Sequence, residues 1–289
     1  MKLPRFDYAS PQSLEEAIAL LEADEGAKIL SGGQSLLPIM AFRMSHPSLL
    51  VDLQRIEGLN RISISDKGVR LGARVRWCDI EANRDLAYAH PLIPEMISHV
   101  AHFQIRHRGT VGGSLAHADP SAEMPGLAVV CDCEIVVRGS AGERTIAAAD
   151  FFKGSLETAL AHNEIIVEVR FPPWRPKRRW GFQEFARRRG DFAIAGVAAY
   201  FDLDPDGRMI DAHVGAIGVA DAPQRLPTAE ACLNGRRMSD DVITQAKQAA
   251  RAAISEPLHD LHAAADYRIA LLATLTERVL RSAMNGERP

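Results

Sequence analysis

Two stretches of the sequence share a Gly-Gly-polar-apolar pattern that can bring backbone amides against a ligand. They are ILSGGQSLLPIM, residues 29–40, and TVGGSLAHADPSAEMP, residues 110–125. Glycine has no Cβ atom, so a ligand can approach the backbone closely, and consecutive amides in such a turn bind anions, here with the Ser35 hydroxyl as a further donor. Either stretch alone is more typical of a structural turn, but two of them can hold a diphosphate from both sides. The pair therefore favours a nucleotide diphosphate as the ligand.

The best-known phosphate-binding motifs are absent from the sequence. Neither stretch is G-x-G-x-x-G and no Lys-Ser/Thr pair follows, which excludes the Rossmann fingerprint and the P-loop. Two acidic residues, Asp119 and Glu123, follow the second stretch, and a carboxylate there can accept hydrogen bonds from ribose hydroxyls, as in many dinucleotide sites. For Asp119 we favour a simpler role, which is to cap the turn that Pro120 begins.

Patterns for catalysis or metal binding are missing from the rest of the chain. There is no G-x-S-x-G elbow, and no H-E-x-x-H motif accompanies His99 and His102. Cys131 and Cys133 enter a strand-like run, so alternation would place both thiols on one buried face of a strand, and the spacing of a four-cysteine iron–sulfur site is absent. We therefore expect no catalytic residue and no metal site in this chain.

The overall composition is that of an ordinary globular protein. The chain has 289 residues, of which 47% are hydrophobic and 25% charged, and its net charge of −3 gives no reason to expect a nucleic-acid partner. The segment from Arg170 to Arg189 is strongly basic, but without an aromatic stacking array it favours an inter-subunit surface or a solvated linker. No apolar run reaches the length of a membrane span, so a soluble cytoplasmic protein is expected.

Hydrophobic periodicity and turn residues predict the elements that position the two glycine stretches. Ser13 and Glu16 form a capping box at the start of a helix, and Asp66-Lys67-Gly68 turns a hairpin. A helix is expected over residues 91–106, running into the second stretch. The prolines within residues 171–182 mark a linker to a second unit. The remaining predictions are strands at 27–30, within 134–146 and 164–174, paired strands on either side of residues 204–207, and helices over 239–254 and 266–284.

Five blocks of sequence, taken in order, resemble one known family. The blocks are KILSGGQSLLPIMAFRM, IRHRGTVGGSLAHADPSAEMP, DFFKGSLETALAHNEIIVEVRFP, FARRRGDFAIAGVAA and DYRIALLATLTERVL. Together they resemble the FAD-binding medium subunit of the molybdenum hydroxylases, the family of carbon monoxide dehydrogenase and xanthine dehydrogenase. The resemblance covers essentially the whole chain, and five ordered blocks are far more specific than either glycine pair alone.

The resemblance implies an α+β fold with two domains. Residues 1–175 would form an FAD-binding region of two α/β subdomains, at about 1–57 and 58–175. Residues 176–289 would form a C-terminal domain of the carbon monoxide dehydrogenase flavoprotein type, with a small antiparallel sheet and a helical bundle.

The resemblance also implies which residues contact FAD. Residues 31–35 and 110–114 would embrace the diphosphate, Glu123 would bind the adenosine ribose, and Ile166 would pack by the isoalloxazine near the polar Gln183. Two positions depart from the common family pattern, Ser114 in place of Asn or Asp and His107 in place of Asn. The full set of implied FAD-binding residues is Ile29, Ser31, Gly32, Gly33, Gln34, Ser35, Leu36, Thr110, Gly112, Gly113, Ser114, Leu115, Glu123, Ile166 and Gln183.

The implied activity is electron transfer within an oxidoreductase complex. A large partner subunit would hold a molybdenum–pterin cofactor and a small one two [2Fe–2S] clusters, assembled as a dimer of heterotrimers, and this chain would pass electrons through FAD to an external acceptor. The sequences of the two glycine blocks are most similar to those of subunits acting on N-heteroaromatics such as quinoline or nicotine, and carbon monoxide and aldehydes stay open as substrates. Two other classes stay open: a self-sufficient flavin oxidoreductase, and a non-catalytic nucleotide-binding assembly module.

Overall fold

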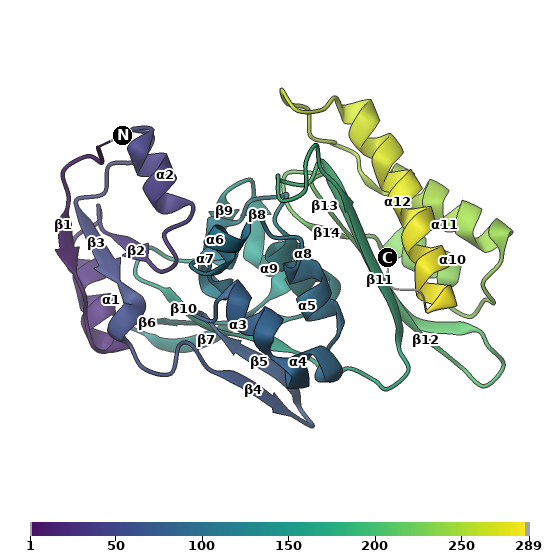
Figure 1. Cartoon of the computed structure of the whole chain (residues 1–289), viewed down its shortest axis with the longest axis horizontal. Helices are drawn as coiled ribbons and strands as arrows, with labels where there is room; N and C mark the ends of the chain where they lie inside the picture. Colours follow the sequence, from purple (N-terminus) through teal and green to yellow (C-terminus); the bar gives the residue numbers. More distant parts are fainter. Residues whose placement is uncertain (1, 287–289) are drawn as a thin grey trace.

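Three sheets and their helices lie side by side along the longest axis of the molecule (Figure 1). The structure is a computed structural model and describes residues 2–286. A three-stranded sheet lies at the N-terminal end, a five-stranded sheet in the middle and a four-stranded sheet at the C-terminal end. A two-stranded ribbon of β8 (Phe152–Gly154) and β9 (Glu157–Thr158) completes the strands. Because sheets and helices mix in each part, the predicted α+β fold class is confirmed.

The N-terminal sheet is parallel and has the strand order β1-β3-β2. Its first helix begins as predicted, because the Ser13 hydroxyl accepts a hydrogen bond from the Glu16 amide at 3.1 Å. The Glu16 carboxylate in turn accepts from the amide of Gln12 at 2.8 Å, one residue earlier than in a standard capping box. The elements are β1 (Asp7–Ala9), α1 (Leu14–Ala23), β2 (Lys28–Leu30), α2 (Leu36–Ala41), β3 (Leu49–Asp52) and the 3-10 helix η1 (Leu53–Arg55).

The middle sheet is antiparallel throughout, in the order β4-β5-β10-β6-β7. The predicted hairpin is confirmed, since Ser65 pairs with Gly68 across a two-residue turn and Gly68 has φ of +109°. Seven short helices accompany this sheet. The elements are β4 (Ile62–Ser65), β5 (Gly68–Gly72), α3 (Trp77–Ala82), α4 (Arg84–Ala89), α5 (Leu92–Ile97), α6 (Phe103–Arg106), α7 (Val111–His117), α8 (Glu123–Val130), β6 (Glu134–Gly139), β7 (Gly142–Ala147), α9 (Ala148–Phe151) and β10 (Ile165–Phe171).

Two predictions in the middle region are wrong in detail. The helix expected over 91–106 breaks into α5 and α6, because Ala101 has φ of +42° and the Arg106 guanidinium donates to the carbonyls of Val100 and Ala101. These hydrogen bonds satisfy carbonyls that a continuous helix would have satisfied internally. The two neighbouring cysteines are buried as expected but do not lie on a strand, since Cys131 ends α8 and Asp132 has φ of +49°.

The C-terminal sheet, β11-β12-β13-β14, is antiparallel and carries three helices on one face (Figure 1). The predicted strand pair around residues 204–207 is confirmed: the Asp204 carboxylate accepts from the amides of Asp206 and Arg208, and Gly207 has φ of +75°. Both predicted helices are also confirmed. The elements are β11 (Arg179–Phe185), β12 (Ala195–Leu203), β13 (Met209–Ile217), β14 (Gln224–Arg225), α10 (Pro227–Leu233), α11 (Asp240–Ala253) and α12 (Ala265–Asn285).

The basic segment between β10 and β11 is partly buried rather than fully solvated. Arg178 pairs with Asp202 at 2.8 Å and with Asp211 at 2.5 Å, and its guanidinium lies over the rings of Tyr200 and Trp174. Two carboxylates and two aromatic faces thus surround one arginine at the junction of the middle and C-terminal parts. This part of the segment is therefore an internal contact and not a free linker.

The C-terminal sheet packs against the middle region through a shared hydrophobic core. Phe182, Ala198 and Tyr200 of the sheet belong to the same buried cluster as Met96 of α5 and Leu127 of α8. The opposite face of the sheet packs against α10, α11 and α12 in a second cluster, and a third cluster lies under α1. Among residues 2–286, no helix is both long and apolar enough to cross a membrane.

Candidate functional site

The two glycine stretches, about eighty residues apart in the sequence, touch each other in the structure. The hydroxyl of Ser31 lies 2.9 Å from the hydroxyl of Thr110, which is hydrogen-bond distance. A Cβ atom on Gly32 would lie only 2.4 Å from the carbonyl oxygen of Arg108. Glycine at position 32 is therefore required for this close approach of the two segments.

The first stretch is an open turn that leaves backbone donors unused. Gly33 has φ of +72°, a conformation that other residues rarely adopt. The side-chain amide of Gln34 donates to the carbonyl of Gly32 at 3.1 Å, so Gln34 closes the turn on itself. Within residues 2–286, the amides of Gly33, Gln34 and Ser35 donate to no protein acceptor. Three adjacent amides are thus available to an anionic ligand.

The second stretch differs from expectation, because its glycines lie in a helix and not in an open loop. Thr110 caps α7 and accepts a hydrogen bond from the Gly113 amide at 3.2 Å, and the Gly112 amide donates to Ala73 at 2.7 Å. A Cβ atom on Gly112 would lie 2.6 Å from the Cβ of Ala73. These glycines permit close packing of α7, and the segment offers hydroxyl groups to a ligand in place of free amides.

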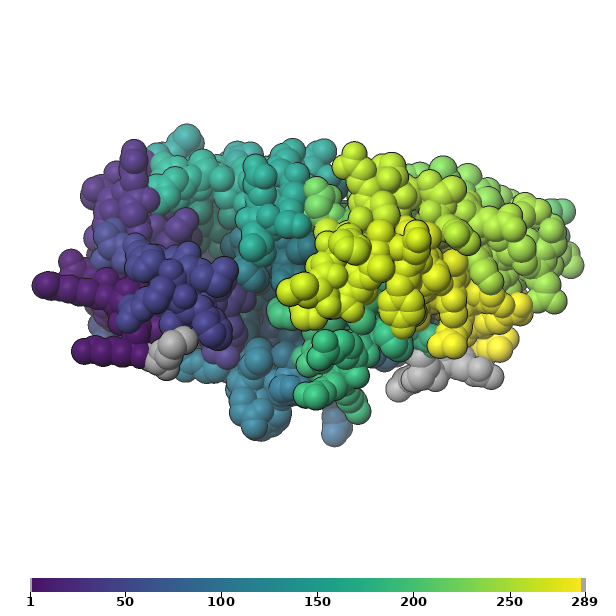
Figure 2. Space-filling view, turned by 90° about the horizontal axis from the view of Figure 1, so that it is seen from above, coloured from purple at the N-terminus to yellow at the C-terminus, as the bar shows by residue number. Residues whose placement is uncertain are grey.

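A large cavity, of about 1020 Å³, lies between the three parts of the chain. Figure 2 shows the surface hollowed between the purple-blue N-terminal segment and the yellow C-terminal helix. The volume is at the upper end of the range for small-molecule and cofactor sites. Thirteen of the predicted FAD-binding residues line it: Ile29, Ser31, Gly32, Gly33, Gln34, Ser35, Leu36, Thr110, Gly112, Gly113, Ser114, Glu123 and Ile166.

The other two predicted residues lie outside the lining. Leu115 is fully buried in the hydrophobic core, because it points from α7 toward the middle sheet and not toward the cavity. Gln183 lies in the middle of β11, where it pairs with Val197 of the neighbouring strand. Asp119 lines the cavity and also takes the simpler role that we favoured, since its carboxylate accepts from the Ser121 amide at 2.8 Å.

Glu123 lies at the start of α8 and is the buried acid of the cavity wall. Burial, followed by the charge of the neighbouring Glu184 carboxyl, raises the pKa of Glu123 from 4.5 to about 8. The Glu184 side chain is itself only 6% exposed, and one of its oxygens lies 3.4 Å from Nδ1 of His99. At neutral pH Glu123 is therefore a neutral acid that can donate a hydrogen bond as well as accept one.

Sequence reasoning missed the C-terminal wall of the cavity. Arg268, buried at the start of α12, donates to the carbonyls of Ile194 and Gly218 at 2.6 Å and to the Asp260 carboxylate at 2.7 Å. Together with Phe192 it contributes to the lining. No sequence motif marks this arginine as a wall residue, because its partners lie 50 and 74 residues away.

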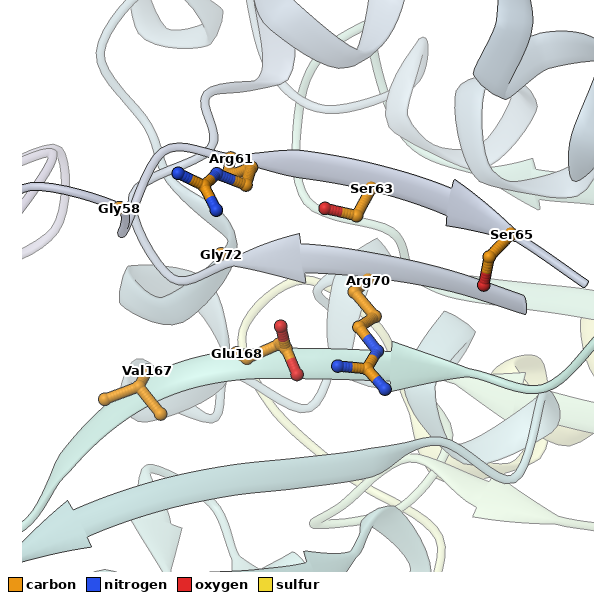
Figure 3. A pocket seen from close by; sticks show the side chains of 8 residues that line it. All are labelled: Gly58, Arg61, Ser63, Ser65, Arg70, Gly72, Val167 and Glu168. Carbon is orange, nitrogen blue, oxygen red and sulfur yellow. The ribbon is translucent and has the colours of Figure 1, made fainter. Parts of the chain in front are cut away.

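Residues 2–286 contain a second, smaller hollow but no cluster of side chains suited to a metal ion. No cluster of three or more His, Cys, Asp or Glu side chains within residues 2–286 is arranged to hold a metal ion. A separate hollow of about 340 Å³ lies on the solvent-facing side of β4, β5 and β10, with Arg61, Arg70 and Glu168 around it (Figure 3). It contains none of the predicted site residues.

Glycine-lined walls, free turn amides and a volume of this size define a protein that binds a large nucleotide cofactor. The residues also fit FAD in particular, since unused amides suit its diphosphate and a buried aliphatic side chain, Ile166, suits a flat ring. The glycines also allow the two segments to pack closely, whereas the amides of residues 33–35 have no acceptor within residues 2–286.

Comparisons with known proteins agree with this class. Residues 4–174 match the family described as the FAD binding domain in molybdopterin dehydrogenase, and residues 180–283 match the CO dehydrogenase flavoprotein C-terminal domain. The chain is 40% identical over 282 residues to the nicotine 6-hydroxylase medium subunit of Paenarthrobacter nicotinovorans, covering 97% of this chain and 98% of that one.

Solved structures give the same result. A chain of carbon monoxide dehydrogenase from Hydrogenophaga pseudoflava superposes with a TM-score of 0.95 at 35% identity, and one of quinoline 2-oxidoreductase from Pseudomonas putida 86 with 0.94 at 38%, each covering 99% of both chains. The chain therefore belongs to the FAD-binding medium-subunit family of the molybdopterin dehydrogenases. It is an FAD-binding oxidoreductase subunit.

Proposed function

We propose that this chain is the electron-transfer subunit of a heteromeric molybdenum hydroxylase. In that role it passes electrons from [2Fe–2S] clusters in a partner subunit to an external acceptor. The observation that carries the proposal is the joining of both glycine stretches, through Ser31 and Thr110, on one wall of a cofactor-sized cavity. FAD, when bound there, supplies the ability to exchange electrons one or two at a time.

The residues of the chain would bind and orient the cofactor without taking part in bond chemistry. The amides of residues 33–35 would hold the diphosphate, with the hydroxyls of Ser31 and Thr110 beside them. Glu123, neutral at pH 7, would donate a hydrogen bond toward the ribose side of the cofactor. Ile166 would pack against the flavin ring. Leu115 and Gln183 would act indirectly, from the core and from β11.

The Arg268 contacts would hold the C-terminal wall in place. By fixing the backbone at Ile194 and Gly218, this side chain keeps the segment that precedes β12, which includes Phe192 and Ile194, against the cavity. A rigid third wall excludes water and fixes the position of the bound group. The three parts of the chain that meet here are the proposed units, residues 1–57, 58–175 and 176–289.

The proposed partners and substrate follow from the relatives. Several are named as medium subunits or chains, which supports assembly with a large and a small subunit. The large subunit would hold a molybdenum–pterin cofactor and the small one [2Fe–2S] clusters, and the proposed assembly is a dimer of heterotrimers. Relatives named for nicotine, caffeine and quinoline support an N-heteroaromatic substrate, to be oxidised on the large subunit.

The first experiment is a visible spectrum of the purified full-length chain after incubation with FAD. We expect flavin absorption at about one FAD per chain, and we expect Gly33→Asp to abolish it because an added carboxylate would occupy the anion-binding turn. A colourless protein that takes up no FAD would leave only the non-catalytic nucleotide-binding module.

The second experiment is co-purification with the products of the neighbouring genes, followed by metal analysis. Molybdenum and iron in the purified complex, together with substrate-dependent reduction of the flavin, are expected. A lone chain that turns over a small organic substrate without either metal would instead identify a self-sufficient flavin enzyme.

A further inference from the structure

The hollow beside the middle sheet is separate from the cofactor cavity and has a polar lining (Figure 3). Its volume is about 340 Å³, and none of its lining residues also lines the larger cavity. Strand pairing brings these residues together, because Arg70 of β5 lies opposite Ser63 of β4 and opposite Arg170 of β10, on one face of the sheet. The polar side chains of the lining are Arg61, Ser63, Ser65, Arg70 and Glu168.

One end of the hollow is formed by the segment that joins the N-terminal sheet to the middle sheet. A Cβ atom on Gly72 would lie 2.4 Å from the carbonyl oxygen of Leu59, and the Gly72 amide donates to the carbonyl of Arg61 at 2.9 Å. Residues 58–61 therefore fold closely over the end of β5, and the absence of a side chain on Gly72 permits this approach. As a result Arg61, which precedes β4, lines the same hollow as Arg70.

The two arginines of the hollow differ from a neighbouring arginine in having no acidic partner. Arg170 pairs with Glu168 at 2.7 Å and lies 3.8 Å from Glu143. Neither Arg61 nor Arg70 has a carboxylate of residues 2–286 within ion-pair distance. Arg70 also lies directly opposite Arg170 in the strand register, and like charges in this position destabilise a sheet. A bound anion would compensate this excess of positive charge.

We propose that the hollow binds a phosphoryl dianion, either free phosphate or the phosphate group of a small ester. A guanidinium group can donate two parallel hydrogen bonds to phosphoryl oxygens, so Arg61 and Arg70 offer two such pairs. The Ser63 and Ser65 hydroxyls are further donors, since the Ser65 oxygen accepts from the Lys67 amide at 3.2 Å and keeps its hydrogen for a ligand. The volume is at the lower end of the range for small-molecule sites, which suits a ligand of this size.

Glu168 would make the hollow selective for a ligand that carries a hydroxyl group. One of its oxygens accepts from the Arg170 guanidinium at 2.7 Å, and the other accepts no hydrogen bond from residues 2–286. Phosphate at neutral pH retains at least one O–H group, and small phosphate esters carry hydroxyls on carbon, so each can donate to this oxygen. Sulfate has no hydrogen to donate, and the carboxylate would repel it. We therefore expect phosphate to bind more tightly than sulfate.

The test uses the full chain saturated with FAD, so that the free amides of residues 33–35 are occupied. Isothermal titration calorimetry measures the dissociation constants of phosphate, glycerol 3-phosphate and sulfate at one ionic strength, set with sodium chloride. The key variant is Arg61→Gln with Arg70→Gln. The matched control is Arg237→Gln with Arg251→Gln, which removes two exposed arginines of the C-terminal part that also have no ion pair among residues 2–286.

We expect the wild type to bind phosphate or glycerol 3-phosphate with a dissociation constant below about 1 mM. The key variant should bind at least about tenfold more weakly, and the control should stay within about twofold of the wild type. Arg61→Lys with Arg70→Lys keeps both charges but loses the paired hydrogen bonds, so its affinity should lie between the two. FAD content should be unchanged in every variant, because these side chains are exposed and do not line the cofactor cavity.

The relative affinities of the probes identify the source of the phosphoryl group. Tighter binding of glycerol 3-phosphate than of phosphate would assign the site to an ester, and any other order of the two would assign it to free phosphate. Wild-type binding weaker than about 1 mM, a key variant that binds as tightly as the wild type, or sulfate that binds as tightly as phosphate would each overturn the proposal.

A second arm separates the hollow from the anion-binding turn of the cofactor cavity. The titration is repeated on Gly33→Asp, in which an added carboxylate occupies that turn. Phosphate binding should persist in this variant although FAD binding is lost. If phosphate binding disappears together with FAD binding, the anion belongs to the cofactor cavity and the inference is overturned, while the proposed function stands.

Discussion

Replacing Glu123 with glutamine should change how the stability of the protein depends on pH. In the folded chain burial and the nearby Glu184 raise the pKa of Glu123 from 4.5 to about 8, so the carboxyl stays neutral where the unfolded chain would ionise it. Each pH unit between these values costs about 1.4 kcal/mol of folding free energy. The full window therefore amounts to roughly 5 kcal/mol, an upper bound because Glu184 interacts with the same proton.

The sign of the pH dependence of stability follows from the direction in which the pKa of Glu123 is shifted. Because the folded pKa lies above the unfolded one, the stabilisation is complete below pH 4.5 and is lost progressively as the pH rises through 8. Glutamine has nearly the same shape and can still donate a hydrogen bond, but it cannot ionise. Between pH 6 and 8 the wild type should thus lose up to about 2.7 kcal/mol relative to Glu123→Gln.

Urea denaturation of the full chain at pH 5, 6, 7, 8 and 9, followed by tryptophan fluorescence, measures this difference. Glu57→Gln is the control, since Glu57 is exposed and its substitution makes the same chemical change in contact with solvent. Glu184→Gln should reduce the slope, because it removes the second carboxyl. Parallel stability curves for the wild type and Glu123→Gln across this range would refute the assignment of Glu123 as a buried neutral acid.

Three further predictions concern the glycines, a histidine and the cysteines. Gly32→Ala should lower FAD affinity far more than Gly113→Ala, because the added methyl group meets the rigid Arg108 carbonyl in the first variant and only the Thr110 hydroxyl in the second. FAD titration measures both affinities, and equal losses would argue against the close contact of the two segments. Burial lowers the pKa of His90 to about 3, so the stability that this neutral histidine allows above pH 6.5 should be lost as the pH falls toward 3. In acid denaturation His90→Gln should abolish this pH dependence, and a variant as sensitive to acid as the wild type would contradict the prediction. Cys131 and Cys133 are buried, which also raises the pKa of their thiols, whereas Cys78 and Cys232 are only half-buried. Iodoacetamide should therefore label Cys78 and Cys232 in the native chain and the other two only after unfolding, as mass spectrometry of the peptides would show.

Much of the local structure followed from the sequence, because it depends on neighbours in the chain. The start of α1 depends on Ser13 and Glu16, and the hairpin of β4 and β5 on a two-residue turn before Gly68. The apolar stripe of α12 is also a local pattern, and Leu272 and Val279 are buried as that stripe requires. Five ordered blocks of sequence were enough to indicate the family and its cofactor.

Features that depend on distant contacts were decided only by the tertiary structure. The break after α5 depends on the Arg106 side chain, and the placement of Gly112 in a helix depends on Ala73. Gln34, whose role no pattern indicated, closes its turn through a hydrogen bond to Gly32. In each case a packing or hydrogen-bonding partner, rather than the residue type alone, determined the outcome.

The cavity combines features that depend on local sequence with features that depend on distant contacts. The two stretches suited to a diphosphate could be identified from residue types alone, since glycine and serine have these properties in any fold. Folding brings Ser31 to Thr110, and it buries Glu123 beside Glu184, which raises the pKa of Glu123 and keeps this carboxyl neutral. Folding also decides that Arg268 closes the third wall. The physical reason is that burial and electrostatic coupling arise between groups that the chain brings together only when it folds.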